Sequence, residues 1–153
     1  MKTINHKKAF LWGAIVLIIH MAIGNLFYMN PLVMNIFKEY EGHPTMKPME
    51  VFGGLTNWIM LNAIFSIIFV AILILLYLKL YESIPGKGWK KGLSFGLIIA
   101  FVKAIPEAFN QFMVFNYPTV LILVQLVNAI LSLIIFGILL SLFFNKFKVI
   151  TYE

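Results

Sequence analysis

Four long apolar runs constrain this chain more than any other feature of its sequence. They cover about 10–29, 55–78, 92–114 and 119–144. A helix needs about 20 mostly apolar residues to cross the roughly 30 Å hydrocarbon core of a bilayer, and each run meets that length. Aromatic residues that favour the membrane–water interface lie near the ends of the runs: Trp12, Tyr28, Trp58, Tyr77, Trp89 and Tyr117. We therefore predict an all-α integral membrane four-helix bundle, a single transmembrane domain over 1–153.

The composition agrees with lipid as the main solvent of this chain. Hydrophobic residues make up 61% of the sequence and charged residues 12%, whereas soluble domains are about 25% charged. The first run resembles a signal peptide, because lysines precede it and Ala22-Ile23-Gly24 resembles a cleavage site. We expect an uncleaved helix there instead, with the lipid bilayer as the main partner of the chain.

The distribution of lysines predicts the orientation in the membrane. Nine lysines lie before the first run, between the second and third, or after the fourth: Lys2, Lys7, Lys8, Lys79, Lys87, Lys90, Lys91, Lys146 and Lys148. On the other side lie only Lys38 and Lys47. Because positive charge stays on the cytoplasmic side, we predict a multi-pass protein of the cell membrane with both termini cytoplasmic.

The connections between the runs differ in length. Those at 83–88 and 116–118 are short, which predicts antiparallel neighbouring helices. The outer loop, 30–54, is long enough to hold structure. There Asn30 can cap a helix that starts at Pro31 and ends near Gly42. This helix is amphipathic, and it lies either along the outer membrane surface or over the bundle as a lid.

Several classes of function are excluded by the composition. The chain has no cysteine, which rules out disulfides, thiolate metal sites and iron–sulfur clusters. Its net charge of +6 comes from lysines that mostly flank the apolar runs, so it indicates membrane orientation and no nucleic-acid partner. We expect no cofactor and no bound metal.

One pair of ionisable residues lies inside the third run. Lys103 and Glu107 are one helical turn apart, so their side chains share a face and can form an ion pair. Gln111 extends this face by another turn, and Pro106 is expected to kink the helix. Ionisable groups at this depth are costly unless paired and indicate a ligand or ion pathway. The alternative is a structural pair that fixes helix packing.

Polar residues of the other runs lie at similar predicted depths: His20 in the first, Asn62 in the second, and Gln125 and Asn128 in the fourth. They predict a polar layer, with one contribution from each helix, in which Glu107 meets Gln125 or Asn62. The alternative is that these side chains form only interhelical hydrogen bonds. Gly92-x-x-x-Gly96 and Gly137-x-x-x-Ser141 predict close helix contacts.

The stretch from Ile84 to Gly137 combines Pro-Gly-Lys-Gly, a glycine-rich third run, Ile105-Pro106-Glu107 and Asn128. In these features it resembles small bacterial and archaeal four-helix integral membrane proteins to which no activity is assigned. The resemblance implies the four-helix fold and brings no activity with it.

Two classes of function fit these residues best. In the first, the protein binds or transports a small solute or ion through the polar site around Lys103 and Glu107. In the alternative, it is an accessory or structural subunit of a membrane complex. An enzyme would need a nucleophile or metal with a positioned base, and only His20 and Glu107 are available, so we expect none. A homo-oligomer or a larger membrane complex is expected in either class, and the sequence does not identify the solute.

Overall fold

The computed structural model describes residues 2–152, in which four helical segments are long and apolar enough to cross a membrane. Three of them are single helices: α1 (His6–Met29), α3 (Leu55–Leu80) and α6 (Thr119–Lys146). The segment Trp89–Val114 is composed of α4 (Trp89–Ile99), the π-helical turn η2 (Ala100–Ala104) and α5 (Ile105–Val114). The predicted all-helical character is thereby confirmed, and the four long apolar helical segments are compatible with a multi-pass membrane protein.

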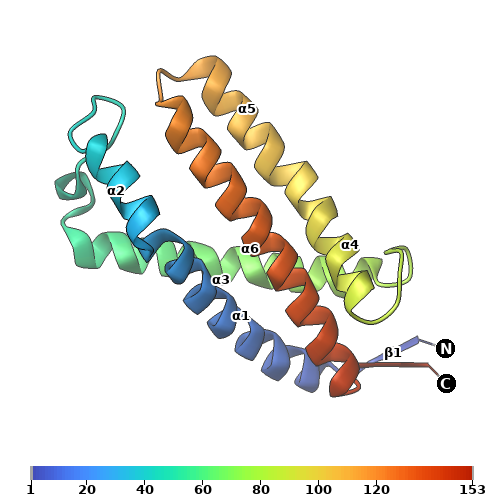
Figure 1. Ribbon diagram of the computed structural model, residues 1–153. Coiled ribbons are helices and arrows are strands. Elements are labelled where there is room, and N and C mark those ends of the chain that lie inside the picture. The colour runs from blue at the N-terminus through green and yellow to red at the C-terminus, as the bar shows by residue number, and fades with distance from the viewer. Residues whose placement is uncertain (1, 153) are drawn as a thin grey trace.

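The two chain ends meet in a short antiparallel ribbon that the sequence did not predict. Strand β1 (Lys2–Ile4) pairs with β2 (Ile150–Tyr152), and Thr3 lies opposite Thr151. Both termini therefore lie at the same end of the helices (Figure 1). We call this the terminal end, and the opposite end, where α5 turns into α6, the loop end.

The long loop contains the predicted helix. Helix α2 (Pro31–Glu39) begins with Asn30 as its N-cap, whose side-chain oxygen accepts a hydrogen bond from the backbone nitrogen of Val33 at 3.0 Å. Val33 is buried, and α2 contacts α1 and α6. A 3₁₀ turn, η1 (Met49–Phe52), follows before α3. The contact with α6 favours the lid interpretation of this helix.

The closest helix contact joins α4 and α6 and uses the predicted small residues. A Cβ atom added to Gly96 would lie 2.6 Å from the carbonyl oxygen of Leu133, and one added to Gly92 would clash with Gly137. The hydroxyl of Ser141 donates to the carbonyl of Gly88 at 2.7 Å. The prediction of close contacts at these positions is confirmed, since only glycine allows the backbones to approach so far.

The buried core lies beside this contact, in the terminal half of the molecule. It gathers side chains from α1, α3, α4 and α6: Val16, Leu73, Tyr77, Phe95, Phe136, Leu140 and Phe144. The rings of Tyr77 and Phe95 meet edge to face, with centroids 5.1 Å apart. Aromatic pairs of this kind add about 0.5–1.5 kcal/mol to the free energy of burial.

Helix α3 packs along only part of its length. Val70, Leu73, Tyr77 and Leu78 are its buried residues, all in its C-terminal half. It runs obliquely across the other helices (Figure 1), and the large apolar side chains of its first half are exposed. The short connection at 83–88 therefore brings the end of α3 next to α4 without making the two helices close neighbours throughout, and that part of the sequence-based expectation was wrong.

A buried lysine fixes the turn between α3 and α4. The ammonium group of Lys91 donates to the backbone carbonyls of Tyr81 and Ile84, the latter at 2.7 Å, and lies 4.4 Å from the centre of the Tyr81 ring. These carbonyls follow the C-terminus of α3, where backbone acceptors lack helical partners and a cation is favoured. Lys91 was predicted only as an orientation signal, and it also has this structural role.

Candidate functional site

Lys103 and Glu107 form the predicted ion pair. The Nζ atom of Lys103 lies 2.8 Å from Oε2 of Glu107, and the two side chains are 37% and 53% exposed. At 1.5 Å per residue, Lys103 lies roughly 16 Å from the end of α5, close to the middle of a bilayer about 30 Å thick. A charge at that depth costs about 2.5–3.5 kcal/mol on insertion scales, which pairing reduces. The pair is thus formed but not enclosed by the rest of the chain.

A π-helical turn, η2, lies directly before Pro106, where a kink was predicted. The backbone nitrogen of Ile105 donates to the carbonyl of Ala100, five residues earlier, and Pro106 follows in the first turn of α5. Proline lacks the N–H that would continue the α-helical pattern, so a wider turn is a suitable junction. Turns of this kind often occur at functional sites, and this one carries Lys103.

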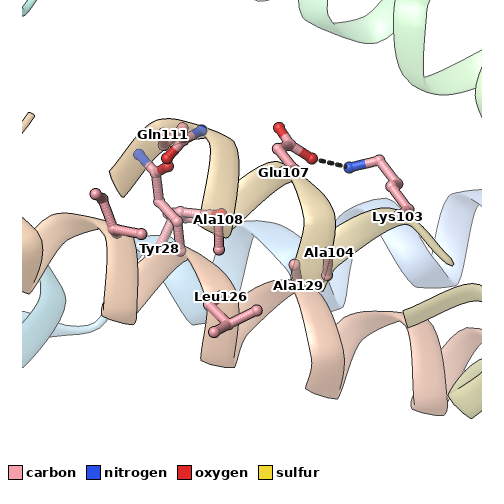
Figure 2. Close-up of a pocket in the computed structure, with 10 residues that line it drawn as sticks. Tyr28, Lys103, Ala104, Glu107, Ala108, Gln111, Leu126 and Ala129 are labelled. Carbon is pink, nitrogen blue, oxygen red and sulfur yellow. Dashed lines mark hydrogen bonds and ion pairs between the residues drawn. The ribbon is translucent and has the colours of Figure 1, made fainter. Parts of the chain in front are cut away.

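A cleft of about 110 Å³ opens beside the ion pair, between the third and fourth membrane segments. We call it the α5–α6 cleft. Its lining comes from α1, η2, α5 and α6: Tyr28, Lys103, Ala104, Glu107, Ala108, Gln111, Ile122, Gln125, Leu126 and Ala129. Figure 2 shows Lys103, Glu107 and Gln111 along one side of the α5 segment. The small side chains of Ala104, Ala108 and Ala129 leave the space that larger residues would fill.

A second hollow of about 290 Å³ continues the cleft toward the loop end. It is lined by Thr45, Gln111, Phe115, Tyr117 and Gln125. The amide nitrogen of Gln125 donates to the hydroxyl of Tyr117 at 3.0 Å. Gln111 and Gln125 line both hollows, and we call the two hollows together the polar track, which extends from the loop end to Lys103.

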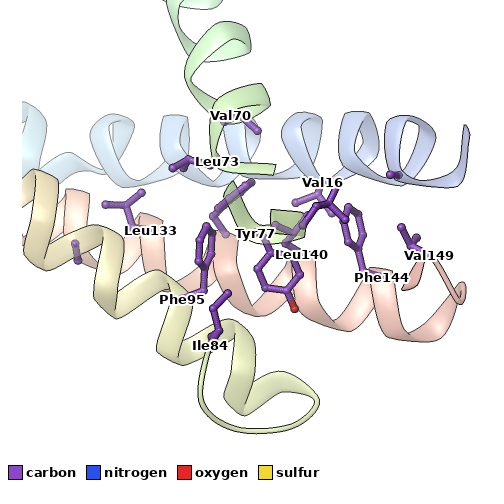
Figure 3. Close-up of a cluster of buried hydrophobic side chains, with 14 residues drawn as sticks. Val16, Val70, Leu73, Tyr77, Ile84, Phe95, Leu133, Leu140, Phe144 and Val149 are labelled. Carbon is purple, nitrogen blue, oxygen red and sulfur yellow. The ribbon is translucent and has the colours of Figure 1, made fainter. Parts of the chain in front are cut away.

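The track ends at Lys103. The ammonium group of this residue lies 5.4 Å from the centre of the Phe69 ring of α3. Toward the terminal end follow the glycine contacts of α4 with α6 and the buried core, in which Tyr77, Phe95 and Phe144 lie against one another (Figure 3). The polar groups therefore reach from the loop end only to about the middle of the molecule.

The structure separates the other predicted members of the polar layer from this cleft. The amide of Asn62 donates to the carbonyl of Trp58 in its own helix, at 2.9 Å, because the first half of α3 stands away from α5. The ring of His20 meets that of Phe136 edge to face, with centroids 5.1 Å apart. Asn128 is buried in α6 and does not line the cleft. The expectation that Asn62, His20 and Asn128 join Glu107 in one polar layer was therefore wrong.

Glu107 was expected to reach Gln125 or Asn62 directly or through one water. Among the described residues no direct hydrogen bond joins them, although Gln125 lines the same cleft. The carboxylate of Glu107 accepts a hydrogen bond from Lys103, whereas the amide of Gln125 donates to the hydroxyl of Tyr117. Tyr28 and Tyr117 take part in the track instead. They were interpreted only as interface aromatics, and their position near the end of an apolar run gives no sign that hollows would open beside them.

The chemistry available in the cleft is polar and directional. A carboxylate accepts hydrogen bonds, an ammonium group donates them, and the amides of Gln111 and Gln125 do both. Among residues 2–152, no group of three histidine, aspartate or glutamate side chains is placed to hold a metal ion. No protein-family model, no curated protein sequence and no solved structure matches this chain. The site's own geometry therefore carries the functional argument.

Proposed function

We propose that this protein is a four-helix bundle of the cell membrane that binds a small solute at Lys103 and Glu107. The solute enters through the polar track from the loop end, which faces outward when both termini are cytoplasmic. The lysine asymmetry supports this orientation, since nine lysines lie at the terminal end or at the turn beside it. The observation that carries the proposal is that the two hollows share Gln111 and Gln125 in their linings and that one of them is lined by the ion pair.

Binding is favoured over transport by the extent of the polar track. A transport path needs polar groups across both leaflets, and here the terminal half is filled by glycine contacts and apolar side chains. The ion pair lies at the inner end of the track, where its partly exposed charged groups are accessible to a solute. We propose no catalytic role for it.

A second function is supported by the first half of α3. Leu55, Ile59, Ile64 and Phe65 are exposed there, although this part of the helix contacts the η1 turn that precedes it. A helix of another subunit packed against it would make this protein an accessory or structural subunit. Helix association in membranes depends on packing and hydrogen bonds, and Asn62 would be available for both.

Native mass spectrometry of the gently solubilised protein tests the two functions together. We expect a retained small ligand in the wild type and in Glu39→Gln, a control in the exposed loop helix, and its loss in Glu107→Gln. Retention of a partner protein without any small ligand would support the subunit function and reject the binding site.

The orientation has its own test in single cysteines, since the natural chain contains none. Thr45→Cys should react with an impermeant maleimide added to intact cells, and Ser83→Cys only after the membrane is opened. Labelling of both from the same side would reject the four-span topology, and the reverse pattern would reject the orientation.

A further inference from the structure

We infer that the ligand of the α5–α6 cleft is a zwitterion, with an ammonium group, a carboxylate or phosphate group, and no net charge. This inference rests on the proposed function, because it names the class of solute that the same site takes. It follows from the charge balance of the cleft, from the separation of the paired charges and from the size of the space.

The charge balance of the cleft selects a ligand without net charge. Of the described residues that line it, Lys103 and Glu107 are the ones charged at neutral pH, so their sum is zero. A singly charged anion or cation would leave an uncompensated charge near the middle of the bilayer, which is unfavourable. When a zwitterion is bound, the net charge of the site remains zero, as in the empty site.

The geometry of the pair matches a ligand with two opposite charges. Nζ of Lys103 and Oε2 of Glu107 are 2.8 Å apart and partly exposed on the same side of the helix. A ligand that places its anionic group at Lys103 and its ammonium at Glu107 surrounds each charge with opposite ones. A singly charged ligand can bind only the oppositely charged member of the pair. It displaces the other member from that partner and provides no opposite charge to the displaced side chain.

The surroundings complete a site for a small head group. The amide nitrogen of Gln125 already donates to Tyr117, which leaves its oxygen to accept from a ligand ammonium, while Gln111 can donate to a ligand oxygen. The polar groups and the open space of about 110 Å³ suit a compact polar head group. The ligand is therefore a free zwitterion from the outer side or the zwitterionic head group of a lipid whose chains remain outside the cleft.

Calorimetry on the full-length protein in detergent tests the class with three related probes. They are glycerophosphoethanolamine as the zwitterion, glycerol 3-phosphate as the anion and ethanolamine as the cation. We expect the zwitterion to bind at least tenfold more tightly than either other probe. The variant with Lys103→Met and Glu107→Gln together should lose this binding, and the control with Lys38→Met and Glu39→Gln in the loop helix should keep it.

A parallel experiment with lipids distinguishes a free zwitterion from the head group of a lipid. Phosphatidylethanolamine or phosphatidylglycerol is added to the same protein, and native mass spectrometry reports which lipid is retained. Selective retention of phosphatidylethanolamine without binding of the free probe identifies a lipid ligand, and binding of the free probe identifies a solute. Either result supports the zwitterion.

Two outcomes would overturn the inference, and they can be told apart. Equal or tighter binding of a singly charged probe, or of phosphatidylglycerol, that depends on Lys103 and Glu107 would reject the zwitterion and leave the proposed binding function standing. Failure of every probe and both lipids, in a protein that also retains no ligand from cells, would reject both.

Discussion

In the terminal half of this protein, α4 and α6 approach so closely that their contact admits only glycine, whereas in the loop half α5 and α6 leave a polar cleft. Helix α3 shows the same contrast, because its buried residues all lie in its C-terminal half and the large apolar side chains of its first half are exposed. The closely packed half and the open half meet at η2, where the third apolar segment changes from α4 to α5. Small residues thus pack the helices closely at one end, while the other end contains an open cleft.

The largest effect is expected from filling the α4–α6 contact. Gly92→Leu places a branched side chain against the backbone of Gly137 and should prevent folding or cost well over about 3 kcal/mol, since backbone atoms cannot move aside as a flexible side chain does. Thermal unfolding in detergent measures this. The control is Gly24→Ala, since nothing lies within 4 Å of an added Cβ there, and alanine should be neutral or up to about 1 kcal/mol stabilising. Equal behaviour of the two variants would show that the close contact does not hold the helices together.

Two leucines of α3 compare its halves directly. Leu73 is 2% exposed and Leu61 is 54% exposed. We expect Leu73→Ala to destabilise by about 2–4 kcal/mol because it leaves a cavity in the core. Leu61→Ala should change the unfolding free energy by less than about 0.5 kcal/mol, because lipid or detergent fills the space. A large loss in Leu61→Ala would mean that the first half of α3 is packed against a partner.

Substitution of Lys91 should destabilise the turn at the terminal end, whereas substitution of its neighbour Lys90 should not. Lys91→Met removes two charged hydrogen bonds to backbone carbonyls and should cost about 1.5–3 kcal/mol. Lys90→Met, at an exposed position, should be close to neutral. Similar unfolding temperatures for these variants would contradict the capping role assigned to Lys91.

Variants of the ion pair distinguish an effect on stability from an effect on ligand binding. Lys103→Met or Glu107→Leu alone leaves one charge uncompensated and should cost up to about 3 kcal/mol, with the partial exposure of the pair reducing the effect. The double variant should recover most of this stability. If the pair binds the ligand, the double variant folds and retains none. A double variant that regains both stability and ligand retention would show that the pair only holds helices.

Local patterns predicted the helices well, because each was determined by its own run of apolar residues. The cap of α2 at Asn30 and the small-residue contact of Gly92 with Gly137 could also be read from short spacings. The strands β1 and β2 could not, because three-residue segments at opposite ends of the chain carry no periodic signal. Depth counting placed Asn62 level with Glu107 but could not show that α3 turns away from α5, since that depends on how whole helices cross.

If a solute reaches Glu107 from the outer side through the α5–α6 cleft, water must reach this residue by the same route. Adjacent cysteines test this access most directly. Ala108 lines the cleft, whereas Phe109 is 64% exposed on another face of the same helix and is not part of the lining. A thiol reacts with maleimide as the thiolate, which requires water. We predict that Ala108→Cys in intact cells is labelled by an impermeant maleimide at least tenfold faster than Phe109→Cys. Equal rates for the two positions, or no labelling of Ala108→Cys in correctly inserted protein, would contradict the account.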